Sequence, residues 1–195
     1  MADAAGISHV TESLRALLRA AIAASGALST AQVDLRSPRE IGAASSQALL
    51  SLWLYRVTRL DELNNAPPVR RPDGRIVQRP LPLNLHFLMT PIAGDALTAQ
   101  RLLGIGMQAL HQEPRLNAEF LHTALIDSGD SPIGIHLEPQ TLEEATRIWH
   151  ALHQPYQLST AYLLQYVPIE TTLSVMDAPP VLEKLTGYAA IERVA

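Results

Sequence analysis

The stretch LLSLWLYRV, residues 49–57, is apolar at nearly every position, and after a long connection it is followed by LPLNLHFLM, residues 81–89. The first run predicts a strand covered on both faces, because a half-exposed strand alternates apolar and polar residues. The second run does alternate, with leucine, phenylalanine and methionine at its odd-numbered positions, and predicts a half-buried strand. These two strands are the centre of the expected sheet.

The connection between the two strands, residues 59–80, is rich in residues that favour turns and extended chain, including Pro67, Pro68, Pro72 and Gly74. We expect a long loop without helix, and loops of that length inside a compact domain are usually functional or disordered. Because no helix joins the two strands, we prefer a mixed or antiparallel sheet to a doubly wound parallel one.

Charge sets this connection apart from the rest of the chain. Residues 56–79 hold six arginines against three acids, and since the whole chain carries −4, the remainder carries −7. Such a split predicts a basic surface that docks on an acidic partner or on phosphate, although a solvated loop kept soluble by arginine is the alternative. The protein-interface candidates are Arg56, Arg59, Asn64, Asn65, Arg70, Arg71, Arg75 and Arg79.

The rest of the chain predicts helices interleaved with shorter strands. An apolar stripe at helical spacing, an Asp95 cap and a capping box at Thr141 and Glu144 mark the clearest helices. We expect helices over residues 8–25, 95–114, 116–125 and 141–152, and further strands over residues 33–35, 133–139 and 156–170. The fold class is α/β or α+β, one sheet flanked by helices, with residues 1–170 as a single domain and residues 171–195 as a C-terminal arm.

Composition excludes several classes of protein. A chain of 195 residues that is 47% hydrophobic can bury a core without staples, and the lack of cysteine excludes disulfides and thiol chemistry. Glu12, Arg15 and Arg19 interrupt the apolar N-terminal pattern, which a secretory signal would not tolerate. No run of about 18 apolar residues occurs, so we expect no membrane span and folding in the cytoplasm.

No group of residues has the spacing of a metal, cofactor or catalytic site. His150 and His153 lack a third ligand, and favourable charge at a helix C-terminus explains them more simply. His86 and His111 are expected to be hydrogen-bonded structural histidines. No serine has the GxSxG setting of a nucleophile, so we do not expect an enzyme.

The glycine spacing argues against a dinucleotide ligand, and the scarcity of aromatic residues near the arginines argues against nucleic acid. Gly104 and Gly106 lack the third glycine and preceding strand of a dinucleotide loop, and are expected to permit close helix packing. Nucleic acid is disfavoured because the chain is acidic and only Tyr55 neighbours the arginines. A protein-binding protein fits best. A small enzyme or ligand-binding domain with His86 and the arginines around an anionic pocket stays open, as does a nucleic-acid adaptor.

Several segments together resemble a known family, the tail-terminator or cap proteins of contractile injection systems, of the N-terminal domain type. These systems are phage-tail-like particles released by bacteria. The segments are LWLYRVT (52–58), the Asn64-Asn65 turn, PPVRRPDGRIVQRPLPLNLHFLMT (67–90), AQRLLGIGMQALHQEPRL (99–116), LEEATRIWHALHQPYQLSTAYLLQYVPIE (142–170) and APPVLEK (178–184).

The resemblance implies a fold like phage tail terminators and a hexameric ring that ends the growth of tube and sheath. The implied partners are further copies of the chain and the tube and sheath proteins, in a particle assembled in the cytoplasm and released outside the cell. We expect the arginines of residues 70–79 to contact acidic surface on the tube or a neighbouring subunit. Residues from 171 onward would reach another chain by strand addition.

Overall fold

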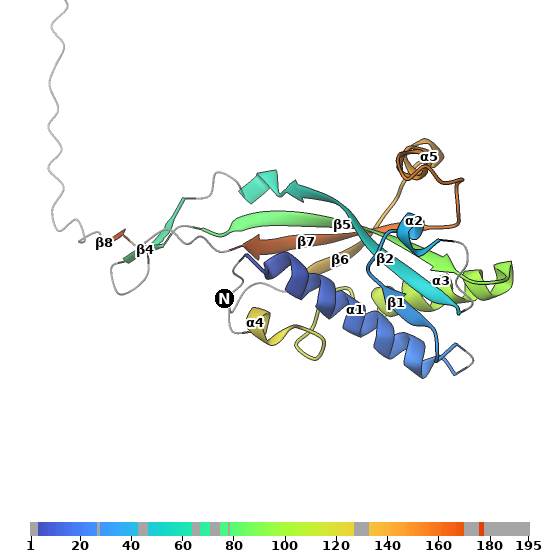
Figure 1. The fold of residues 1–195 in the computed structure, drawn as a ribbon. Helices are drawn as coiled ribbons and strands as arrows, with labels where there is room; N and C mark the ends of the chain where they lie inside the picture. The colour runs from blue at the N-terminus through green and yellow to red at the C-terminus, as the bar shows by residue number, and fades with distance from the viewer. Residues whose placement is uncertain are drawn as a thin grey trace, which may run out of the picture.

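The computed structural model describes residues 4–26, 28–42, 47–63, 67–70, 75–77, 79–126, 133–169 and 176–177. Its body is a five-stranded sheet in the order β1-β2-β5-β7-β6 (Figure 1). β1 is parallel to β2, and the other neighbouring pairs in this sheet are antiparallel, which confirms the predicted mixed sheet. The strands are Gln32–Asp34 (β1), Leu49–Arg59 (β2), Leu81–Ile92 (β5), Gly134–Glu138 (β6) and Thr160–Ile169 (β7).

Helices pack on both faces of this sheet. α1 (Gly6–Ala24), α3 (Ala96–Gln112) and α4 (Thr123–Ile126) lie on one face, and α5 (Leu142–Ala151) lies over the other (Figure 1). The apolar residues of α1 and α3 recur at spacings of three and four, so they form one buried stripe on each helix. The main core between these helices and the sheet includes Leu14, Leu18, Leu50, Leu52, Phe87, Met89 and Leu102.

Side chains fix where the helices begin. Asp95 accepts a hydrogen bond from the backbone N–H of Thr98 and so satisfies a donor that has no partner inside α3. Thr141 and Glu144 form the predicted capping box at the start of α5. A second box, of Ser37 and Glu40, begins α2 (Pro38–Ile41), a helix of one turn. Its S-x-x-E spacing is present in the sequence, although the predicted elements do not include this helix.

The burial of the two central strands is the reverse of what their sequences predict. β5 is buried on both faces over residues 85–92, although its alternation predicts an exposed face, and β2 is exposed at Arg56 and Arg59. Position in the sheet explains the difference. β5 lies between β2 and β7, and Trp149 of α5 clusters with Leu88 on its second face, whereas the second half of β2 lies away from α5.

Two predicted boundaries are also wrong. β7 begins at Thr160 rather than at residue 156, because α5 is followed by turns in which His153 has a φ of 53°. The helix predicted over residues 116–125 is reduced to the short α4, which begins at Thr123. The start of this segment is not helical, because the backbone N–H of Leu116 donates to the carbonyl of Ile133 beside β6. β6 itself lies where the sequence places it.

The arginine-rich connection is not the plain loop that its composition predicts. It contains a 3-10 helix at Asp61–Leu63 and two short antiparallel strands, β3 (Val69–Arg70) and β4 (Arg75–Val77). β4 also pairs with β8 (Met176–Asp177), which lies in the predicted arm. These three strands form a second sheet beyond the end of the first (Figure 1). The rest of the arm lies outside the described residues, and its addition to another chain stays a prediction.

Gly104 and Gly106 differ although both lie in α3. A Cβ at Gly106 would come within 2.9 Å of Met89 Sδ and 3.2 Å of Leu50 Cδ2, so this glycine lets α3 approach the sheet, as predicted. A Cβ at Gly104 would meet nothing within 4 Å, so the same prediction is wrong there. The two positions therefore form a matched pair for testing the contact.

Leucine at position 106 should lower the free energy of unfolding by about 1–3 kcal/mol, because it overfills the contact between α3 and the sheet. Leucine at position 104 should raise it by about 0.5–1 kcal/mol, because leucine favours an exposed helix more than glycine does. Urea unfolding of the Gly106→Leu and Gly104→Leu variants measures both. Equal effects at the two sites would contradict the packing assigned to Gly106.

Candidate partner-binding surface

A polar network lies on the α5 side of the sheet and joins β2, β5 and β6. His86 Nδ1 lies 3.0 Å from both carboxylate oxygens of Glu138, and His86 Nε2 lies 3.0 Å from Thr58 Oγ1. The Tyr55 hydroxyl donates to Glu138 Oε2 at 3.2 Å and accepts a hydrogen bond from Gln140 Nε2 at 3.0 Å. The imidazole of His86, in a residue only 7% exposed, is thus held from two sides.

A β-bulge brings Tyr55 into this network. The register between β2 and β5 shifts between Leu54 and Arg56, which leaves Tyr55 as an extra residue on β2. Burial raises the pKa of Tyr55 to about 12, and the negative charge of Glu138 acts in the same direction. The phenol is therefore neutral at ordinary pH and can donate to the carboxylate.

His86 is a hydrogen-bonded structural histidine, as the sequence predicts. Both of its ring nitrogens are engaged, one by Glu138 and the other by Thr58. Because both ring nitrogens already have partners within the protein, His86 does not fit the alternative of an anionic-substrate pocket. The network instead links side chains of β2, β5 and β6 across the face of the sheet on which α5 lies.

The raised pKa of Tyr55 predicts a loss of stability in alkali. Because folding favours the neutral phenol, the stabilisation is complete below the unfolded pKa near 10.0 and disappears as the pH rises toward about 12. Glu138→Gln should lower the ionisation midpoint of Tyr55, since it removes the neighbouring negative charge. Ultraviolet titration of tyrosinate, with Tyr55→Phe to assign the signal, measures this midpoint.

The exposed carboxylate of Glu143 on α5 provides a matched control for the Tyr55 titration. Glu143→Gln removes the same charge from a side chain that pairs with Arg147 and does not contact Tyr55. It should leave the Tyr55 midpoint at the wild-type value. An unchanged midpoint in Glu138→Gln would contradict the proposed contact between Glu138 and the phenol.

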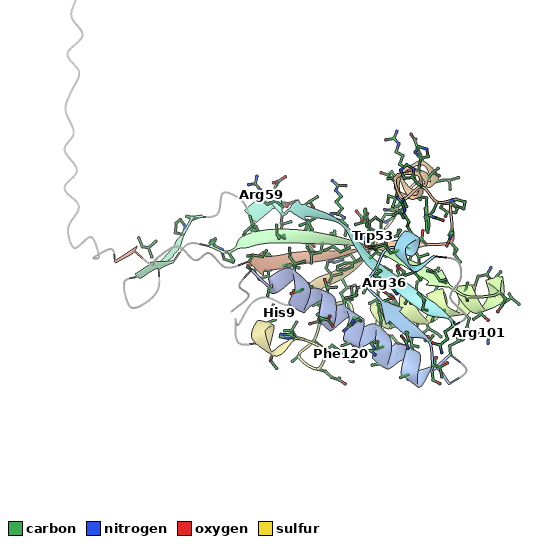
Figure 2. The ribbon with its side chains drawn as sticks, viewed as in Figure 1. His9, Arg36, Trp53, Arg59, Arg101 and Phe120 are labelled. Atoms are coloured by element: carbon green, nitrogen blue, oxygen red, sulfur yellow. The ribbon has the colours of Figure 1, made fainter. Side chains whose placement is uncertain are left out.

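Two of the predicted interface arginines lie on the body of the molecule. Arg56 and Arg59 are exposed on the second half of β2, and Figure 2 shows Arg59 at the end of this strand that faces the second sheet. Arg59 Nε donates to Asp61 Oδ1 at 3.3 Å, an exposed pair that contributes little to stability. Both guanidinium groups are therefore placed where a partner can reach them.

The other candidates belong to the connection itself. Arg79 is exposed, and its Nε donates to the carbonyl of Pro67 at 2.8 Å, which ties together the two ends of the segment that contains β3 and β4. Arg70 and Arg75 lie on β3 and β4, so the backbone brings them into the second sheet. Asn64, Asn65 and Arg71 lie outside the described residues. The role of all eight residues in an interface stays a prediction.

A shallow groove lies beside Arg79 and includes residues that the sequence pattern does not single out. We call it the Arg79–Arg115 groove, and besides these two arginines its lining includes His136, Gln165 and Tyr166. These residues come from four separate segments, so no spacing along the chain relates them. The left-handed backbone of Tyr166, with a φ of 65°, also leaves no mark in the sequence.

The residues that the structure describes form neither a metal site nor a membrane-spanning helix. No group of three or more histidine, aspartate or glutamate side chains there could hold a metal ion, and His150 and His153 are both exposed. None of the described helices is both long enough and apolar enough to cross a lipid bilayer.

The chain belongs to the Pvc16 N-terminal domain family, whose model matches residues 9–183. A comparison with curated proteins found no match. The fold is similar to two proteins whose structures were solved by cryo-EM. One is the sheath/tube terminator of the extracellular contractile injection system PVC in its extended state, with a TM-score of 0.67 and 17% identity over 97% of this chain.

The second similar structure is the tube-terminating cap of the anti-feeding prophage, AFP. Its TM-score is 0.60, with 19% identity over 92% of this chain. The chain spans 64% of the PVC terminator and 60% of the AFP cap. At these identities the likeness establishes the fold, and it confirms the predicted tail-terminator architecture.

Proposed function

We propose that this chain is a structural cap of a contractile injection system, which forms a ring and ends the polymerisation of tube and sheath. The observation that carries the proposal is the match of nearly the whole chain to a family and a fold represented by a terminator and a cap. The function of a ring subunit is to present surfaces to its neighbours, so no catalytic site, cofactor, nucleic acid or membrane is required.

The placement of the arginines supports this function. Arg56, Arg59 and Arg79 are exposed near one end of the sheet, and Arg70 and Arg75 lie on the strands that extend beyond it (Figure 1). A cap must bind the last layer of a polymer through one end of its ring, and a charged end fixes the orientation of docking. The partners of the proposed ring are further copies of the chain, in a hexamer, and the tube and sheath proteins.

The proposed cap assembles in the cytoplasm and leaves the cell as part of the particle. Its ring requires heterologous contacts, in which one face of each copy meets a different face of the next. The body of the chain has two different sheet edges for such contacts, β1 on one side and, on the other, β6 with the Arg115 segment that bridges to Gly134. Their difference suits a head-to-tail arrangement better than a two-fold one.

Replacement of four arginines in the connection tests the proposal. In cells that make the particle, the combined variant Arg70→Ser, Arg71→Ser, Arg75→Ser and Arg79→Ser should broaden the tail-length distribution and lower particle yield, because it weakens docking on the acidic partner. Negative-stain images of purified particles measure both quantities.

The control variant replaces four exposed arginines elsewhere, on α1, α2, α3 and α5. Its substitutions are Arg19→Ser, Arg39→Ser, Arg101→Ser and Arg147→Ser. This protein should give particles of normal length and yield. Normal particles from both variants would rule out the arginine-rich connection as the docking element.

A further inference from the structure

We propose that the Arg79–Arg115 groove is a docking site for an extended acidic segment of the protein that the cap binds. This inference rests on the proposed function and adds a specific surface and a specific chemistry to it. The groove lies where β2 passes into the 3-10 helix, and where β5 and β6 begin, so it adjoins the arginine-rich connection. Among the described residues of its lining, Arg79 alone belongs to the predicted interface set.

The charge of the groove selects an anionic partner. Arg79, Arg115 and His136 are exposed, and no acid is present among the described residues that line the groove. The acids on the neighbouring 3-10 helix are Asp61, which accepts a hydrogen bond from Arg59, and Glu62. Each of the two guanidinium groups can bind a carboxylate through paired hydrogen bonds. The groove is therefore a cationic surface on a chain whose net charge is negative.

The backbone that carries Arg115 is ordered before any partner arrives. Arg115 forms a bridge with Gly134, flanked by hydrogen bonds from Leu116 N to Ile133 O at 3.0 Å and from Ile135 N to Pro114 O at 2.8 Å. The segment that carries Arg115 is thus an added edge of β6. A preordered cation loses less conformational freedom on binding than one on a free loop does.

Gly134 fixes the position of the imidazole in the groove. A Cβ at Gly134 would lie 2.7 Å from His136 Nε2, so the ring rests against the backbone of this glycine. A larger residue would push the imidazole away from β6. The contact keeps the side chain of His136 beside Gly134 in the lining of the groove.

A strained residue lies at the same place. Two β7 residues, Gln165 and Tyr166, lie opposite Asn84 of β5, which makes a bulge, and Tyr166 takes a φ of 65° there. A bulky side chain in the left-handed region costs about 1–3 kcal/mol and persists where the surrounding structure enforces it, often at ligand sites. Such bulges redirect a side chain, and here the redirected residue is a tyrosine that lines the groove.

The rest of the lining favours a peptide over a nucleic acid. Leu60 and Leu63 provide an apolar end, which suits an apolar side chain in the partner and offers nothing to a phosphate backbone. A strand of nucleic acid would also require several aromatic rings for its bases, whereas the described residues of this lining include a single Phe, Tyr or Trp, Tyr166, beside the imidazole of His136. The occupant is therefore an extended chain with both acidic and apolar residues.

Fluorescence anisotropy with a labelled short peptide that alternates glutamate and leucine tests the groove. The wild-type protein should bind this peptide, and its affinity should fall as salt rises. Arg115→Glu should weaken binding by about tenfold or more, because it places a like charge beside the peptide. Arg147→Glu, an exposed arginine on α5, is the matched control and should bind as the wild type does.

The Tyr166→Gly variant tests whether peptide binding needs the tyrosine ring, in a protein whose fold is not destabilised. Glycine adopts the left-handed backbone without strain, so this variant should unfold at the wild-type temperature or above it and yet bind the peptide several-fold more weakly. Equal binding by wild type and Arg115→Glu would overturn the docking site. The docking site would also be overturned if the protein bound single-stranded DNA more tightly than it binds the glutamate–leucine peptide. The same holds if it bound a peptide with lysine in place of glutamate equally well.

The same variants test the docking groove and the proposed cap function separately. Peptide binding reports on the groove alone, whereas tail length in cells reports on capping. Loss of both in Arg115→Glu supports the groove and its use in the cap. Peptide binding in the groove, together with tail length that does not depend on this chain at all, would overturn the cap and leave the docking site standing.

Discussion

The burial of β5 on both faces is the constraint on which the rest of the structure depends. This strand pairs with β2 along one edge and with β7 along the other, and each of these contacts extends over most of its length. α1 and α3 cover one face through the main core, and α5 covers part of the other through Trp149 and Leu88. Because both edges and both faces are occupied, β5 cannot shift its register without exposing apolar residues.

Both partners of β5 carry a bulge, and in each bulge the extra chain includes a tyrosine. Tyr55 on β2 reaches Glu138, and Tyr166 on β7 lines the Arg79–Arg115 groove. Bulges increase local twist and redirect side chains, so they lend an otherwise regular sheet two specific polar features. α5 lies over one part of the sheet, and the end of β2 and the start of β5 extend away from it (Figure 1). The proposed docking surface thus lies at the end of these strands that is farther from α5.

Local sequence signals predicted the elements that depend on local physics. The stripe of α1, the Asp95 cap and the box at Thr141 were sufficient because caps and helical spacing involve residues within one or two turns. The absence of a helix between β2 and β5 predicted their antiparallel pairing correctly. The burial of β5 and β2 was predicted wrongly, because which strand is central depends on how distant segments assemble.

The candidate site shows the same division. The excess of arginine in residues 56–79 is visible in the sequence, and so is the turn-rich composition around it. The pairing of β4 with β8 and the approach of Arg115 to Arg79 join segments far apart in the chain, so spacing could not reveal them. The left-handed Tyr166 was also hidden, since tyrosine itself favours ordinary strands and the bulge arises from the register with β5.

The location of this chain in purified particles tests the central claim most directly. Cryo-EM of particles with a tagged copy of the chain, labelled by an antibody fragment, measures that location. The cap account predicts label at one end of each particle, in a closed ring where tube and sheath both stop. Label along the length of the sheath, or particles of defined length without the chain, would contradict it.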